Sequence, residues 1–90
     1  MENYHKKKKI LETWLLQKFG QIMVWSSEDL IELAKNQKIE TLEGNERLNK
    51  QKILIQLIVI IFTSKSEGLQ KLIKNIEAIE LERLNKEDLS

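Results

Sequence analysis

The residues with the clearest capacity for chemistry are four consecutive lysines near the start of the chain, Lys6, Lys7, Lys8 and Lys9, which follow His5. Adjacent cations create a local positive field that attracts the phosphate groups of nucleic acids or of anionic lipids, and this attraction weakens as salt is added. The alternative interpretation of the same lysines is a solvated start of a helix that aids solubility. We therefore treat Lys6–Lys9 as candidate phosphate contacts.

The sequence contains no combination of residues typical of a catalytic or metal site. His5 is the only histidine and there is no cysteine, which excludes a thiolate nucleophile, a cysteine zinc site and a disulfide. The carboxylates Glu77 and Glu80, or Glu80 and Asp88, are spaced as pairs, but no neighbouring base or metal motif accompanies them. We expect a non-enzymatic protein with no cofactor, no metal and no small-molecule substrate.

The length and composition predict a single helical domain. A chain of 90 residues supports one core and buries about 60 to 65% of the surface that its unfolded form exposes. Proline is absent and there are only three glycines, so long helices can continue without interruption. We predict an all-α fold with one domain over residues 1–84 and a frayed tail over residues 85–90.

The predicted fold is organised around residues 53–62, Ile-Leu-Ile-Gln-Leu-Ile-Val-Ile-Ile-Phe, in which only Gln56 is polar. This apolar run is too short to cross a bilayer, which takes about 20 helical residues, so it is expected to be buried in a core or at a subunit interface. Its β-branched residues make a strand the alternative to a helix. Because the only other weak strand candidate is 22–25, we favour a helix over about 49–63.

Three further segments have apolar residues at helical spacing, and they cover residues 8–23, about ten residues from 27, and about 67–84. The second begins at a capping signal, Ser26-Ser27-Glu28-Asp29. Residues 38–45 have no helical period and predict an extended link, with Ile39 and Leu42 pointing inward. The expected architecture is a compact bundle of about four helices that contains a helix–extended link–helix unit.

Most of the aromatic residues are expected to pack in the hydrophobic core, not to bind a ligand. Trp14, Phe19, Trp25 and Phe62 have rings that can stack on bases, but three of the four lie on or beside apolar stripes. We predict core packing for them. Tyr4, beside the lysines, is the aromatic residue predicted to be free for stacking.

Residues 27–58 follow the pattern of a capped helix, a short extended link and a basic-polar turn that opens an apolar helix. The residues are Ser27-Glu28-Asp29-Leu30-Ile31-Glu32-Leu33-Ala34, then Ile39-Glu40, then Arg47-Leu48-Asn49-Lys50-Gln51-Lys52-Ile53-Leu54-Ile55. This segment resembles the small N-terminal helical domain of transcription termination factor Rho and the wider SAP-type group. The resemblance implies binding of DNA or RNA through cations at the link and at the start of the second helix, which here are Lys35, Lys38, Arg47, Lys50 and Lys52.

These observations lead to one expected function and two alternatives. We expect a small nucleic-acid-binding or nucleic-acid-associated regulatory protein, with DNA and RNA both open. The first alternative is a helical protein-interaction or homodimerisation module that uses the apolar run or the stripe over 69–79. The second is binding to a membrane surface through the basic first helix, which Glu12 opposes. Because polar residues interrupt the segment after Lys9, no signal-peptide core follows, and we expect a cytoplasmic protein without membrane insertion.

Overall fold

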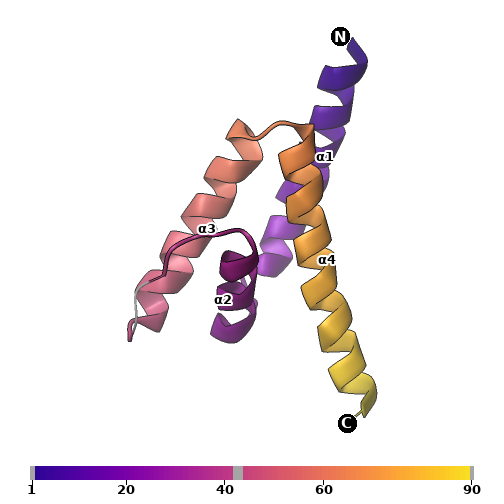
Figure 1. The fold of residues 1–90 in the computed structure, drawn as a ribbon. Coiled ribbons are helices and arrows are strands. Elements are labelled where there is room, and N and C mark those ends of the chain that lie inside the picture. The colour runs from indigo at the N-terminus through magenta and orange to yellow at the C-terminus, as the bar shows by residue number, and fades with distance from the viewer. Residues whose placement is uncertain (1, 42–43, 90) are drawn as a thin grey trace.

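The computed structural model describes the backbone of residues 2–41 and 44–89, and the side chains of residues 6–41 and 44–87. Within these residues the chain forms four α-helices and no strand: α1 (Glu2–Ile22), α2 (Ser27–Asn36), α3 (Glu46–Thr63) and α4 (Ser66–Leu89) (Figure 1). The predicted all-α bundle is confirmed, and the apolar run is helical. The predictions for Tyr4, His5, Leu42 and Asp88 concern side chains outside the described residues.

Local sequence explains where α2 begins and ends. The hydroxyl of Ser26 accepts a hydrogen bond from the backbone N–H of Asp29 at 3.2 Å, which satisfies one of the free donors of the first turn. At the other end Lys38 has a left-handed φ of 59°, and the N–H of Ile39 donates to the carbonyl of Ala34 at 2.8 Å. This arrangement satisfies carbonyls of the last turn and directs the chain away from the helix.

Helix α3 begins earlier than the sequence predicts because Asn45 acts as its cap. The Asn45 side chain accepts a hydrogen bond from the backbone N–H of Leu48 at 3.1 Å. Just before it, Gly44 has a φ of 79°, a conformation that favours glycine. In the link before this turn, Ile39 packs partly buried against the core, as predicted.

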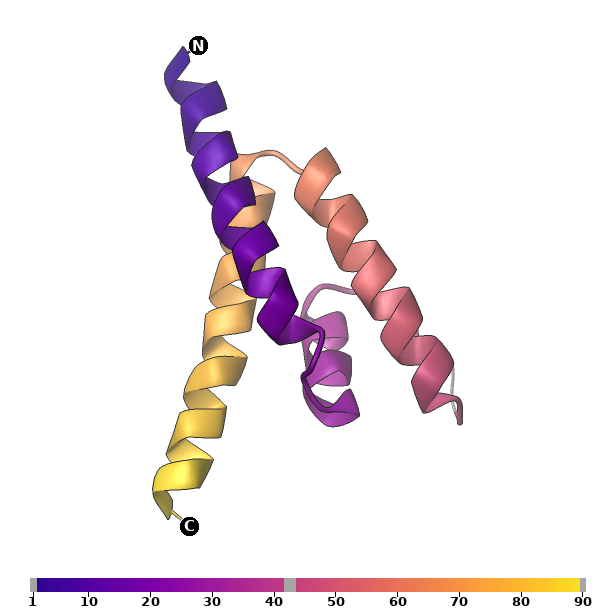
Figure 2. The same cartoon turned by 180° about the vertical axis from the view of Figure 1, so that it is seen from behind.

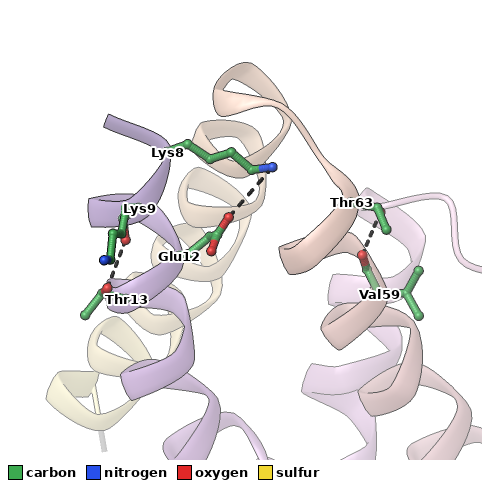
Figure 3. Close-up of polar contacts among 6 residues, drawn as sticks. All are labelled: Lys8, Lys9, Glu12, Thr13, Val59 and Thr63. Carbon is green, nitrogen blue, oxygen red and sulfur yellow. Dashed lines mark hydrogen bonds and ion pairs between the residues drawn. The ribbon is translucent and has the colours of Figure 1, made fainter. Parts of the chain in front are cut away.

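The two terminal helices are longer than predicted. Helix α1 starts at Glu2 rather than near Lys8, and α4 continues through Leu89, so the tail predicted to fray is helical to that residue. Neither added segment contains a glycine or proline, so nothing in them stops a helix. In α1, Lys8 pairs with Glu12 at 3.7 Å, and the Thr13 hydroxyl donates to the carbonyl of Lys9 at 2.9 Å (Figure 3).

The helices form a bundle in which α1 and α4 run in the same direction and cross, while α3 runs in the opposite direction (Figures 1 and 2). Helix α2 is short and packs against both α3 and α4. An ion pair of 2.7 Å between the Lys18 ammonium and the Glu80 carboxylate joins α1 to α4. A side-chain hydrogen bond from Asn75 to Gln37 joins α4 to the end of α2. These two contacts join helices that are far apart in the sequence.

One hydrophobic core lies between the four helices. Its buried side chains come from every helix and from the turn after α1: Leu15, Ile22, Trp25, Leu30, Leu33, Ala34, Ile53, Leu57, Ile61, Leu69, Leu72, Ile76 and Ile79. Trp25 is buried as predicted, and Trp14 and Phe19 pack against the core partly buried. None of the described helices is long and apolar enough to cross a membrane.

Within the single chain the apolar run in α3 is buried on one side only, so burial of its other side at a subunit interface stays a prediction. Ile53, Leu57 and Ile61 face the core, whereas Ile55, Val59 and Phe62 are exposed. Phe62 is 55% exposed, so its predicted place in the core is wrong. The reason is that α3 lies at the edge of the bundle, where the other helices cover one of its sides (Figures 1 and 2).

Candidate interaction site

The outer side of α3 carries a continuous stripe of side chains that do not face the core. We call it the outer face of α3, and it consists of half-buried Lys52 and six exposed residues, Leu48, Gln51, Ile55, Ile58, Val59 and Phe62. Leu48, Ile55 and Phe62 follow one another at intervals of seven residues, which is two helical turns, so they lie above one another along the helix. Since buried Leu57 is two positions from Ile55, the stripe lies opposite the side that faces the core.

The apolar part of this face has the size of the largest apolar patch of a typical monomer. Leu48, Ile55, Ile58, Val59 and Phe62 are between 38% and 59% exposed. Together they expose roughly 450 Å², within the range of roughly 300–600 Å² typical of the largest apolar patch of a monomer, which is often functional. The patch belongs to a single helix and is therefore nearly straight.

Charge is distributed unevenly along α3. Its first half carries Arg47, Lys50 and Lys52, and its only acidic residue is Glu46 in the first turn. Its second half, from Ile53 to Thr63, has no charged residue, and there is no basic residue in its last turn. The negative end of the helix dipole is therefore not balanced by a cation of α3 itself.

A shallow hollow of about 280 Å³ lies in the first half of the outer face. Leu48, Gln51, Lys52, Ile55 and Gln56 line it. Leu48, Gln51, Lys52 and Ile55 stand at positions i, i+3, i+4 and i+7 of a helix, which is the set that receives one side chain from a facing helix when two helices pack as knobs into holes. The lining is mostly apolar, so the hollow suits a hydrophobic side chain.

The first group of predicted phosphate contacts lies at the start of α1. Lys6, Lys7 and Lys9 are exposed, whereas Lys8 is half-buried and paired with Glu12 (Figure 3). A hollow of about 460 Å³ runs along this part of α1, lined by Lys6, Lys9, Ile10, Thr13, Trp14 and Gln17. Two of the predicted lysines therefore share the lining of one hollow with Trp14, and the Lys18 ammonium lies over the Trp14 ring, 5.4 Å from its centroid.

The second group of predicted phosphate contacts does not form one cluster. Lys38 and Lys52 line a common hollow of about 370 Å³, but Glu40 lines it too and opposes an anion there. Lys50 lies beside Glu46 at the first turn of α3. Lys35 and Arg47 are exposed at the end of α2 and the start of α3.

The two groups also lie far from each other. The start of α1 and the start of α3 are at opposite ends of the molecule, which has principal extents of 45 × 32 × 20 Å (Figures 1 and 2). The structure therefore does not gather Lys6–Lys9 and the cations at the start of α3 into one cluster. Among the described residues, no group of His, Cys, Asp and Glu is arranged to hold a metal ion.

The predicted site residues do not include the outer face of α3, although the alternative function predicted from the sequence uses the apolar run to which most of this face belongs. The signal for it is present in the sequence, because Leu48, Ile55 and Phe62 repeat every seven residues in a helix that is also apolar on its core side. The predicted site residues were chosen for positive charge as phosphate contacts, so they include Lys50 and Lys52 of α3 and none of its exposed apolar residues.

Comparisons with known proteins identify no relative of this chain. No family model matches the chain, and neither the curated proteins nor the solved structures contain a significant match. The resemblance of residues 27–58 to the Rho N-terminal domain stays a prediction, and the function is argued from the geometry alone.

Proposed function

We propose that this protein is a non-enzymatic helical interaction module that forms a homodimer through the outer face of α3. The observation that supports the proposal is the straight apolar stripe opposite the core, with Ile55 59% and Phe62 55% exposed. A helix that is apolar on both sides needs neighbours on both sides. The chain supplies them on one side, and a second copy supplies them on the other.

The area available is sufficient for a specific contact between two copies. If all of their exposed area is covered, the apolar residues of the face bury at most roughly 900 Å² in total when two copies pack together, and the stems of Gln51 and Lys52 raise this to about 1,000 Å², near the lower limit for a biological interface. The helix is already formed and held by the core, so little conformational entropy is lost on association. The interface is therefore of the kind expected for a reversible dimer.

The test is the molar mass in solution, measured by light scattering across a range of protein concentrations. The monomer has a mass of 10.7 kDa, and we expect the wild-type protein to approach twice this value as the concentration rises. Ile55→Lys places a charge at the centre of the face and is expected to keep the protein monomeric.

The matched control is Leu81→Lys. Leu81 lies on α4 and is 60% exposed, against 59% for Ile55, so the same substitution changes charge and surface hydrophobicity equally at a site away from α3. It should leave the dimer unchanged. A wild-type mass that stays at 10.7 kDa at every concentration rejects the proposal, as does an equal effect of both variants.

A second candidate function, contact with DNA or RNA, is supported by the hollow beside the first turns of α1. Lys6 and Lys9 provide cations for phosphate, and Trp14 on the same hollow provides a ring on which a base can stack. In this proposal short single strands bind with an affinity that falls as salt is added.

Fluorescence anisotropy of labelled DNA and RNA strands at two salt concentrations tests this second candidate. Replacing Lys6 and Lys9 together with alanine is expected to weaken binding and to reduce its salt dependence. Replacing Lys71 and Lys74, which are exposed on α4, makes the same change in net charge and is the control. Equal loss in both double variants would show nonspecific attraction, and no binding at low salt would exclude the candidate.

A further inference from the structure

The geometry points to an antiparallel arrangement of the two copies, in which the α3 helices run in opposite directions and Phe62 of each copy fills the hollow on the other. This inference rests on the proposed homodimer and specifies its partner surface residue by residue. Three features of the outer face of α3 support it, and they are its charge distribution, its hollow and its exposed aromatic ring.

The charge distribution disfavours a parallel pair. In a parallel dimer equivalent residues lie at the same level, so the basic first halves that carry Arg47 and Lys52 lie alongside each other, and the only acidic residue of each α3 is Glu46. In an antiparallel dimer the basic first half of one α3 lies along the uncharged second half of the other. The two Lys52 residues are then about 13 Å apart along the helix axis, while exposed Lys65, two residues after the end of α3, lies level with Leu48 of the partner.

The helix dipole adds an attraction between the end of one α3 and a lysine of the other, which occurs only in the antiparallel pair. The last turn of α3 has no basic residue, so its partial negative charge is available to a cation from outside. In the antiparallel arrangement Lys52 of one copy lies near this last turn of its partner. The first half of each helix therefore complements the second half of the other electrostatically.

Shape leads to the same arrangement. The hollow lined by Leu48, Gln51, Lys52 and Ile55 is in the first half of α3, and Phe62 is the largest exposed apolar side chain of the second half. Antiparallel packing with the two-fold axis near residues 56–57 brings Phe62 of one copy to the hollow of the other. In a parallel pair the two hollows would face each other, and so would the two Phe62 rings.

The spacing along the helix is consistent with this register. Leu48 and Phe62 are separated by about 21 Å at a rise of 1.5 Å per residue. With the axis near residues 56–57, Ile55 and Ile58 of the two copies meet at the centre, and Gln51 of one copy lies beside Phe62 of the other. The dimer then contains two identical contacts between Phe62 and a hollow, one at each end.

Disulfide crosslinking tests the arrangement directly because the chain has no cysteine of its own. Ile58→Cys is near the axis and should form an intermolecular disulfide in either orientation. Gln51→Cys should form one only in a parallel dimer. A mixture of Gln51→Cys and a mass-tagged Phe62→Cys should form a mixed disulfide only in the antiparallel dimer, since the sulfur atoms need Cα atoms within about 7 Å.

The expected result is a disulfide for Ile58→Cys, none for Gln51→Cys alone, and a mixed disulfide between the tagged and untagged chains. Rapid crosslinking of Gln51→Cys with itself overturns the antiparallel inference but leaves the homodimer intact. A dimer by mass that no variant crosslinks shows that another face associates, which overturns both. A monomer by mass at all concentrations rejects the homodimer itself, so the two failures are distinguishable.

A second measurement avoids the introduced cysteines. Phe62→Ala removes both contacts with the hollows and is expected to raise the dimer Kd by on the order of 100-fold. Leu84→Ala, at 57% exposure on α4, is the control because it removes an equally exposed side chain outside α3. An unchanged Kd for Phe62→Ala would refute the contact between Phe62 and the hollow.

Discussion

Leu57 and Ile55 lie two residues apart on α3, and alanine should destabilise the protein much more at Leu57 than at Ile55. Leu57 is 1% exposed and faces the core, whereas Ile55 is 59% exposed on the outer face. Leu57→Ala removes about three methylene equivalents at about 0.8 kcal/mol each and leaves a cavity, so we expect a loss of about 3 to 4 kcal/mol in the free energy of unfolding. This is a large part of the total stability of about 5 to 13 kcal/mol expected for a domain of this size.

Ile55→Ala should cost much less within a single copy. About two-fifths of Ile55 is covered by its own chain, so the lost burial amounts to about 1 kcal/mol, and the better helix propensity of alanine returns a few tenths of a kcal/mol. Urea unfolding followed by circular dichroism measures both changes. It should be done at low protein concentration so that association does not add to stability.

The comparison can contradict the one-sided burial of α3. If both alanine variants lose about 3 kcal/mol under these conditions, Ile55 is buried in the monomer and the outer face does not exist. If neither loses more than about 1 kcal/mol, α3 does not contribute to the core. A destabilisation by Ile55→Ala that appears only at high protein concentration would support the dimer instead, because subunit association stabilises by mass action.

Three further predictions concern local features and can be measured by urea unfolding. Ser26→Ala should cost about 1 kcal/mol because it removes the cap of α2, whereas Ser27→Ala, one residue later, should be nearly neutral; equal effects would contradict the assignment of Ser26 as the cap. Lys38→Gly should stabilise by about 1 kcal/mol, since glycine adopts the left-handed φ of 59° at no steric cost, and a loss of stability would contradict that conformation. The charged groups of Lys18 and Glu80 lie 2.7 Å apart. A double-mutant cycle on the two residues should give a coupling free energy of about 0.5 to 1 kcal/mol that falls with added salt. Zero coupling would show that the ion pair does not form in solution.

The number of helices could be predicted from the sequence, and burial along α3 could not. Apolar periodicity and capping residues determined α2 and the central part of α4, because these signals are local. The ends of α1 and α4 are polar and lack helix breakers, so no residue marked where they begin or end. For α3, an all-round apolar composition says that the helix needs partners, but not which sides its own chain covers. That depends on the position of α3 at the edge of the bundle.

The candidate site shows a similar limit. The sequence identified exposed cations correctly in the case of Lys6, Lys7 and Lys9, since lysine is rarely buried. The pairing of Lys8 with Glu12 agrees with their i,i+4 spacing in the sequence, whereas the hollow shared by Lys38, Glu40 and Lys52 joins residues of the link and of α3. Whether cations gather depends on where helix ends lie in space, and no pattern along the chain encodes this.

The packing of α1 against α4 has a consequence for the order in which the chain folds. Helix α2, the link and α3 are neighbours in sequence and can come together as soon as they are synthesised, but α1 gains its main partner only when α4 is complete. At a synthesis rate of about 5 to 20 residues per second, the core sides of α1 and α2 that face α4 stay uncovered for a few seconds until α4 is made. During that interval the nascent chain exposes more apolar surface than the finished protein, so a ribosome-bound chain ending before α4 should depend on chaperones far more than the complete chain does.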